Sequence, residues 1–343
     1  MVLGVLGCDQ GPRPLEVAAG PALRLVSSYP ENGAGLDCDL SEPECGVPLD
    51  ASVELRFDRF LLPTSAIRQA VTIRSGNEIV IPRVGPEVEP QYDVFERVVR
   101  YSVPDGTPLK PNAVYSVALG IATSEDSFGF RAFDGAPLAG DEPILITFRT
   151  GSHSSAPAPS PSPVDCEAVF CTAFGGLEPG CDFPLTTGCA AGGCHGEPRE
   201  TAAMGLVLAG AEPFERTAVS RVAHGAETGP TTGAVAEAAL RFGVAMPLID
   251  PGRPDNSYLL YKLLLAPEAY EPNDDGEDPC TGTRRLAPVD PDTCFAPPAD
   301  ELRRLSEWFV QGEPMPLDVP SSFVRRREIR ALQDFILAGA SCR

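Results

Sequence analysis

The sequence predicts two domains of different class, an all-β sandwich followed by a small, mainly α-helical domain. Three features support this division. Residues 22–151 contain short segments in which apolar and polar side chains alternate, the pattern of strands with one buried face. Residues 165–343 instead contain Gly- and Cys-rich loops and segments with helical periodicity. A run rich in Ser and Pro, residues 152–164, lies between the two halves.

The clearest strands lie at residues 53–57 and 115–119. In the first of them Val53, Leu55 and Phe57 alternate with polar residues, which predicts a half-buried strand. Further strands are predicted at residues 23–26, 71–73, 79–81, 98–103 and 144–148. About seven short strands, separated by turns rich in Gly, Pro, Asn and Asp, are typical of a sandwich.

Several segments of the first half occur in an order that resembles the immunoglobulin-like (Ig-like) modules of bacterial surface proteins. They are residues 29–34, 53–57, 109–115 and 148–150. The resemblance covers residues 22–151 and implies an Ig-like β-sandwich there.

A loop between Gly33 and Gly46 carries two cysteines, Cys38 and Cys45. Their short separation in a turn-rich, acidic segment allows the close Cα approach that a disulfide needs, so we expect a local disulfide. A metal-binding pair is the alternative, but the loop has no histidine nearby to complete such a site.

Residues 152–164 have few side chains that could form a core and are rich in Pro, so they predict a stiff, extended linker. Beyond the linker, helices are clearest at residues 301–312 and 328–339. Each segment places its apolar side chains on one helical face and ends at a Gly, which is typical of an amphipathic helix packed on a core.

The charge and cysteine content of the chain exclude some functions and favour one kind of compartment. The chain has 27 Lys and Arg against 48 Asp and Glu, a formal net charge of -21, and such a surface repels nucleic acid. Eleven cysteines, several of them in loops, favour an oxidising compartment. There is no nucleophile elbow, phosphate-binding loop or convincing carboxylate pair, so the sequence does not indicate an enzyme.

The N-terminus contains a segment that resembles the lipobox of bacterial lipoproteins. Residues 5–8 read Val-Leu-Gly-Cys, with the small residue that lipidation requires before Cys8. We therefore expect a lipid on Cys8 that anchors the protein to a membrane of the cell envelope, facing the periplasm or the cell surface. An unmodified cysteine is the alternative. Residues 1–21 are then a signal remnant and tether, and because residues 1–7 are short for a signal, we expect the natural start upstream.

The stretch Cys-Ala-Ala-Gly-Gly-Cys-His-Gly, which begins at Cys189, carries the most specific chemistry. Two thiols can form thioethers with the vinyl groups of haem while the adjacent imidazole binds iron, usually across a two-residue spacer. The spacer here has four residues, and its Ala and Gly allow the longer loop to fold tightly. The alternative is a disulfide between Cys189 and Cys194 beside a surface histidine.

This stretch is similar to a cytochrome-c-like family of bacterial exported proteins in which Cys-x4-Cys-His-Gly recurs. Other segments of the chain match the family in the same order, at residues 204–208, 249–262, 315–316 and 335–340. The resemblance covers residues 187–340 and implies a cytochrome-c-like helical domain within residues 165–343.

The resemblance also implies a cofactor and its ligands. The two cysteines of the motif would hold a covalent haem c, His195 would be the proximal iron ligand, and Met315 the distal ligand. The segment before the first clear helix lacks a methionine that the family often has there. Met246 and His224 therefore stay open as distal ligands, as do a five-coordinate and a haem-free site.

Two functions from different classes follow. The first is an exported, lipid-anchored, haem-binding electron-transfer protein with an Ig-like stalk and a redox protein as its partner. The second is a non-catalytic lipoprotein that interacts with a partner at the cell surface, with a cytochrome-like domain that binds no haem and is held together by disulfides. A zinc site built from Cys166, Cys171, Cys181 and Cys189 competes poorly with both in an oxidising compartment.

Overall fold

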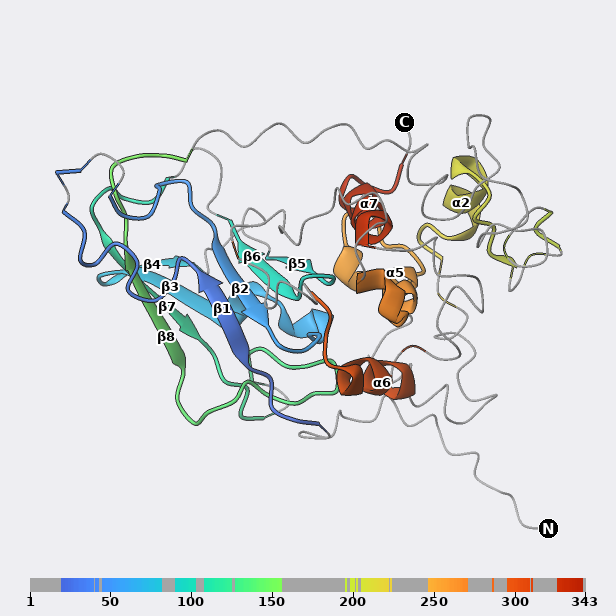
Figure 1. Ribbon diagram of the computed structural model, residues 1–343, viewed down its shortest axis with the longest axis horizontal. Coiled ribbons are helices and arrows are strands. Elements are labelled where there is room, and N and C mark those ends of the chain that lie inside the picture. Colours follow the sequence, from blue (N-terminus) through green and yellow to red (C-terminus); the bar gives the residue numbers. More distant parts are fainter. Residues whose placement is uncertain are drawn as a thin grey trace, which may run out of the picture.

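Two four-stranded antiparallel sheets and a smaller group of helices make up the computed structural model of the chain (Figure 1). Among the residues that the structure describes, no helix is long and apolar enough to cross a membrane. The described residues are 20–39, 41–42, 45–81, 90–102, 108–124, 127–155, 195, 198–200, 202, 205–221, 223, 246–270, 286, 295–308, 310 and 326–341.

The first sheet has the strand order β1-β2-β6-β5. Its strands are β1 (Leu25–Tyr29), β2 (Val53–Phe57), β6 (Val98–Tyr101) and β5 (Gln91–Asp93). β2 lies inside this sheet, with Leu55 opposite Ser28 of β1 on one side and Val99 of β6 on the other. Val98, Val99 and Tyr101 of β6, and Val53 and Phe57 of β2, are β-branched or aromatic side chains, which fit a pleated and buried surface.

The second sheet has the strand order β4-β3-β7-β8. Its strands are β4 (Glu78–Ile81), β3 (Val71–Ser75), β7 (Val114–Leu119) and β8 (Ile144–Arg149). β7 shows the expected alternation, since Tyr115, Val117 and Leu119 are buried and the residues between them are half-buried. The Tyr115 ring stacks on Phe148 with 5.4 Å between centroids. Its hydroxyl accepts a hydrogen bond of 2.8 Å from the Lys110 N–H.

All seven predicted strands are present, with small differences at their ends. β5 was not predicted, because three residues are too few to show a period. The half-buried character predicted for β2 is wrong: Glu54 and Arg56, on its polar face, are 1% and 0% exposed. Both faces of this strand are therefore covered by other parts of the protein.

The α-helices that the structure describes lie in the second half of the chain. They are α2 (Ala211–Thr217), α5 (Tyr258–Leu264), α6 (Ala299–Trp308) and α7 (Arg326–Leu337). The described residues also form 3-10 turns, η1 (Pro63–Ser65) and η2 (Arg68–Ala70) in the first half and η7 (Pro254–Asn256) and η8 (Pro267–Tyr270) in the second. α6 and α7 confirm the two helices that the apolar periodicity predicted.

The helices pack beside one end of the sheets. Figure 1 shows α5, α6 and α7 next to β5, with α2 on their far side. The buried apolar side chains of the sheets and of these helices belong to one continuous hydrophobic cluster. This contact buries Arg56 at the end of β2, and the Arg56 guanidinium lies over the Phe295 ring.

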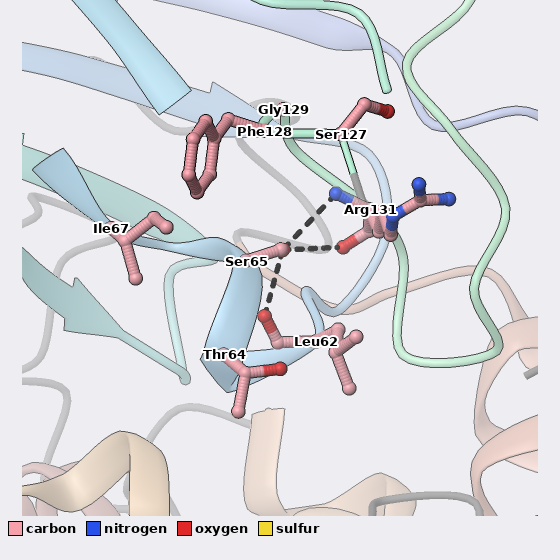
Figure 2. A pocket seen from close by; sticks show the side chains of 8 residues that line it. All are labelled: Leu62, Thr64, Ser65, Ile67, Ser127, Phe128, Gly129 and Arg131. Atoms are coloured by element: carbon pink, nitrogen blue, oxygen red, sulfur yellow. Dashed lines mark hydrogen bonds between the residues drawn. The ribbon is translucent and has the colours of Figure 1, made fainter. Parts of the chain in front are cut away.

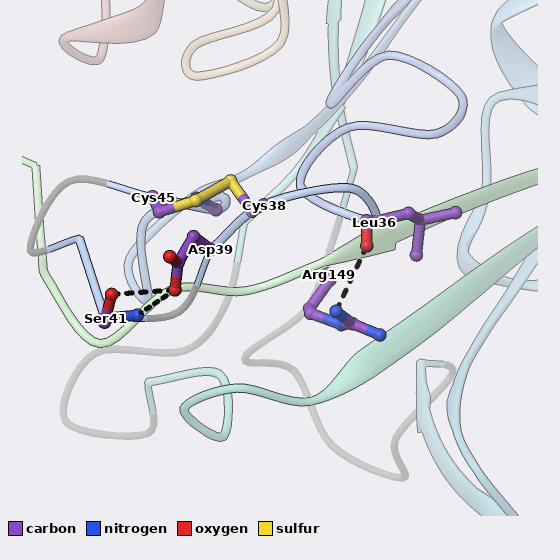
Figure 3. The surroundings of a disulfide bond; sticks show 7 residues. Leu36, Cys38, Asp39, Ser41, Cys45 and Arg149 are labelled. Carbon is purple, nitrogen blue, oxygen red and sulfur yellow. Dashed lines mark hydrogen bonds between the residues drawn. A yellow bond between two sulfur atoms is a disulfide. The ribbon is translucent and has the colours of Figure 1, made fainter.

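The predicted disulfide joins Cys38 and Cys45, whose Cα atoms are 5.7 Å apart. The segment that leads into this loop lies along β8. The Arg149 N–H donates to the Ala34 carbonyl at 2.8 Å, and the Arg149 guanidinium donates to the Leu36 carbonyl at 3.1 Å (Figure 3). The disulfide thus closes the loop on itself, and hydrogen bonds attach the segment that leads into it to the second sheet.

The beginning of the predicted linker is bonded to the first half. The Leu49 N–H donates to the His153 carbonyl at 2.8 Å, and the Ser155 N–H donates to a carboxylate oxygen of Asp50 at 2.6 Å. Residues 156–164, the remainder of the predicted linker, lie outside the described residues.

Replacing Cys38 and Cys45 together by Ser should lower the free energy of unfolding by about 2 kcal/mol, because a disulfide across a short loop restricts the unfolded chain. Urea unfolding followed by far-ultraviolet circular dichroism measures the difference. In reductant, the wild-type protein and the variant should be equally stable. Equal stability of the oxidised wild-type protein and the variant would contradict the prediction.

Candidate functional site

Most of the predicted haem-binding residues lie outside the described part of the chain. This applies to the cysteines Cys189 and Cys194, to Met315 and to the alternative ligand His224, and also to the predicted lipidation site Cys8. The structure does describe the predicted proximal histidine and one alternative distal ligand.

The imidazole of His195 is held by the main chain. Its Nδ1 lies 3.1 Å from the carbonyl oxygen of Leu206, and its own carbonyl accepts a hydrogen bond of 2.8 Å from the Leu208 N–H. Because a carbonyl can only accept, this contact places the proton on Nδ1. In the neutral imidazole the lone pair then lies on Nε2. Metal-ligating histidines commonly have this arrangement, in which one ring nitrogen donates to a carbonyl and the other binds the metal.

The segment that holds His195 is itself buried and bonded. Leu206, Val207 and Leu208 are at most 8% exposed. The Val207 N–H donates to the hydroxyl of Thr217 at 3.0 Å, and that hydroxyl lies 2.8 Å from the Pro213 carbonyl. Thr217 is the last residue of α2, so this helix supports the segment on which the histidine rests.

α2 is joined to the rest of the helical half through aromatic packing. Phe214 of α2 and Phe335 of α7 have ring centroids 6.1 Å apart, and both side chains are fully buried. The Ser220 N–H, just beyond α2, donates to the Ile249 carbonyl at 2.8 Å. α2, and with it the segment bonded to His195, is therefore attached to the buried core of the helical half.

Met246 is a core residue. It is 5% exposed and belongs to the continuous hydrophobic cluster. Its carbonyl accepts a hydrogen bond of 3.0 Å from the Ala223 N–H. A flexible thioether in such a place fills space between apolar neighbours, which is the usual role of a buried methionine.

A cavity of about 220 Å³ lies on the β-rich half, and Figure 2 shows the residues around it. It is lined by Leu62, Thr64, Ser65, Ile67, Ser127, Phe128, Gly129 and Arg131. The Ser65 hydroxyl donates to the Leu62 carbonyl at 2.8 Å and accepts from the Arg131 N–H at 3.1 Å. The lining offers no carboxylate, histidine or cysteine that could activate this hydroxyl, so the cavity lacks a nucleophile with its base.

The structure also contains a cluster of buried charged residues that was not predicted from the sequence. Arg56, Arg59, Glu96 and Arg97 from the first half and Glu301 from α6 meet where the sheets contact the helices, and each is at most 4% exposed. Asp, Glu, Lys and Arg are almost never fully buried unless they are paired. A sign in the sequence was the Arg-Phe pair that occurs at residues 56–57 and again at 59–60, since arginine stems can cover apolar surface.

Among the described residues, no group of three His, Cys, Asp or Glu side chains is arranged to hold a metal ion. In the part of the chain that the structure describes, the candidate site is represented by His195, which is bonded to the main chain and follows Cys194 in the sequence. A haem iron held by one histidine and covalently attached through two cysteines needs no such group.

Comparisons with known proteins assign no family. No family model matches the chain, and no curated protein matches it. Solved structures of the surface layer protein SbsC match part of it: domains 1–6 (TM-score 0.26, 14% identity, 40% of this chain) and residues 31–844 (TM-score 0.25, 11% identity, 40% of this chain). The matches span 15% and 14% of those chains. Similarity at this level supports no conclusion about fold or function.

Proposed function

We propose that this protein is an exported, lipid-anchored, haem-binding protein that transfers electrons. The observation that carries the proposal is the hydrogen bond of 3.1 Å between Nδ1 of His195 and the Leu206 carbonyl, in a histidine that directly follows the second cysteine of a Cys-x4-Cys-His motif. A histidine oriented in this way presents Nε2 as a metal ligand.

The residues of the motif fit a covalently bound haem. Cys189 and Cys194 would form the thioethers, His195 would be the proximal iron ligand and Met315 the distal one. Bound in this way, haem would supply a one-electron redox couple. The apolar segment Leu206–Leu208, buried behind the histidine, would keep water away, and low solvent access is one of the properties that set a reduction potential.

We further propose that the first half is an Ig-like module. Two features support this assignment. The strand orders β1-β2-β6-β5 and β4-β3-β7-β8 correspond to the two sheets of an Ig-like sandwich. The Tyr115 hydroxyl, at the beginning of β7, is bonded to the main chain at Lys110, as in the tyrosine corner of such modules.

The proposed location is the cell envelope, with Cys8 as the lipid-bearing residue. The disulfide between Cys38 and Cys45 supports export, because disulfides persist in oxidising compartments and are rare in the cytosol. Lipidation at Cys8 would place the Ig-like module on the membrane side of the chain, because the tether of residues 1–21 leads directly into it.

Covalent haem is the first expectation to test. Protein produced with a cytochrome c maturation system should show a Soret band that survives extraction with acidified acetone. Cys189→Ala together with Cys194→Ala should abolish it, because both thioethers are lost. Cys38→Ser together with Cys45→Ser is the matched control and should retain full absorbance. A colourless wild-type protein would contradict haem binding and favour a surface interaction protein.

The second expectation concerns the distal ligand. Met315→Ala should remove the weak far-red charge-transfer band of methionine-ligated ferric haem and lower the reduction potential, since a thioether ligand favours ferrous iron. Met246→Ala should leave both unchanged and instead destabilise the fold by about 2–5 kcal/mol, because its side chain is buried in the core. Loss of the band in Met246→Ala alone would reverse the assignment.

A further inference from the structure

One end of the first sheet presents charged and aromatic side chains to the helices. We call this surface the docking end; it consists of Arg56, Arg59, Phe60, Phe95, Glu96 and Arg97. Figure 1 shows that β2 and β5 end, and β6 begins, on the side of the sheet that faces the helices. All six side chains are at most 3% exposed. The partner that covers them is the helical half of the same chain.

Glu301 of α6 makes the most specific contact. One carboxylate oxygen accepts a hydrogen bond of 2.8 Å from Nε of Arg59, and the other accepts one of 3.0 Å from the Phe60 N–H. The far side of the Arg59 guanidinium is bonded to both oxygens of Asp134, at 3.1 and 2.6 Å. Arg59 is therefore shared between a carboxylate of its own half and one from α6, 242 residues away.

Burial makes these charges depend on one another. Burial raises the pKa of Glu301, and the charge of Arg59 opposes this rise. Burial lowers the pKa of Arg59, but the hydrogen bonds and charges of Asp134 and Glu301 outweigh this, so its pKa is raised. Removing one partner of a buried ion pair leaves the other charge uncompensated, which is strongly unfavourable.

Arg97 makes the second contact. Its guanidinium donates to the Phe295 carbonyl at 2.7 Å and lies over the Phe60 ring, 5.7 Å from the centroid. Arg97 is 2% exposed and has a positive φ of 54°. A buried guanidinium thus takes a main-chain acceptor from the opposite half.

The third contact centres on Phe295. The guanidinium groups of Arg56 and of Arg330 from α7 lie 5.2 and 5.3 Å from the centroid of this ring. Both arginines also contact Glu96, at 3.1 and 3.4 Å. Beside this group, Phe95 stacks on Tyr270 of the helical half at 5.6 Å. Arg56 is therefore buried because the helical half covers the polar face of β2.

We propose that the docking end is a binding surface for the helical half, and that this contact holds the two halves together without the covalent linker. Three separate contacts and one continuous hydrophobic cluster carry the proposal. The proposed contact between the two halves is separate from haem binding and does not depend on the presence of haem. α2, which supports the His195 segment, lies on the far side of the helical half from the sheets, so docking leaves that side uncovered by them (Figure 1).

Cutting the linker tests the proposal. A site for a specific protease is inserted after Ser160 in the full-length chain, and the protein is cut in its native state. The two pieces should elute together in gel filtration at micromolar concentration and separate only in denaturant. Elution as two separate pieces would overturn the proposal. A single full-length band on a non-reducing gel would also overturn it, because a disulfide would then be the link.

Glu301→Gln identifies the contact that matters most. This change keeps the shape of the side chain and removes its charge, so the dissociation constant of the cut protein should rise about 100-fold. Asp300→Asn, the neighbouring residue in α6 with an 81% exposed side chain, is the matched control and should change the constant less than about twofold. Equal constants for the two variants would overturn the role of Glu301. Circular dichroism of the uncut variants checks their folding.

Discussion

Arg59 is the residue on which the arrangement of the two halves depends. It is bonded to Asp134 of its own half, to Glu301 of α6 and to the carbonyl of Pro21 just before β1. A buried guanidinium requires several acceptors at once, and these come from segments far apart in the sequence. Satisfying this one charge therefore brings the beginning of the chain, the loop at Asp134 and α6 to one place.

A continuous set of contacts leads from this junction to the proposed haem site. His195 is bonded to the Leu206–Leu208 segment, that segment to α2, and α2 to α7 through Phe214 and Phe335. Arg330 of α7 then contacts Glu96 in the first half. If haem is bound at His195, its position relative to the sheets is set by packed side chains, in contrast to a cofactor domain that swings on a flexible tether.

The sequence predicted the regular elements better than their contacts. Local periodicity was sufficient for the strands and for α6 and α7, because a half-buried element carries its pattern in its own residues. The same pattern misled at β2: Glu54 and Arg56 are polar and alternate with apolar residues, yet both are buried. Arg56 lies against Phe295 of the helical half, which no local pattern connects with β2, and Glu54 is paired with Arg100 of the neighbouring β6.

The residues of the candidate site were also predicted better than their contacts. Residue types and spacing indicated His195 as a ligand, because the chemistry of the motif is local. The group that orients its ring could not be predicted, since it is the main-chain carbonyl of Leu206, and every residue has a carbonyl. The docking end was missed because its partner, Glu301, lies in a helix whose sequence shows only amphipathic character.

A double-mutant cycle between Arg59 and Glu301 tests the interdependence of the two halves most directly. The unfolding free energies of the wild-type protein, Arg59→Met, Glu301→Gln and the double variant give the coupling between the two side chains, free of the contribution of Asp134. A direct buried contact predicts a coupling of about 1–3 kcal/mol. Effects that add within about 0.5 kcal/mol would show that the two side chains do not interact, and would contradict the docked arrangement.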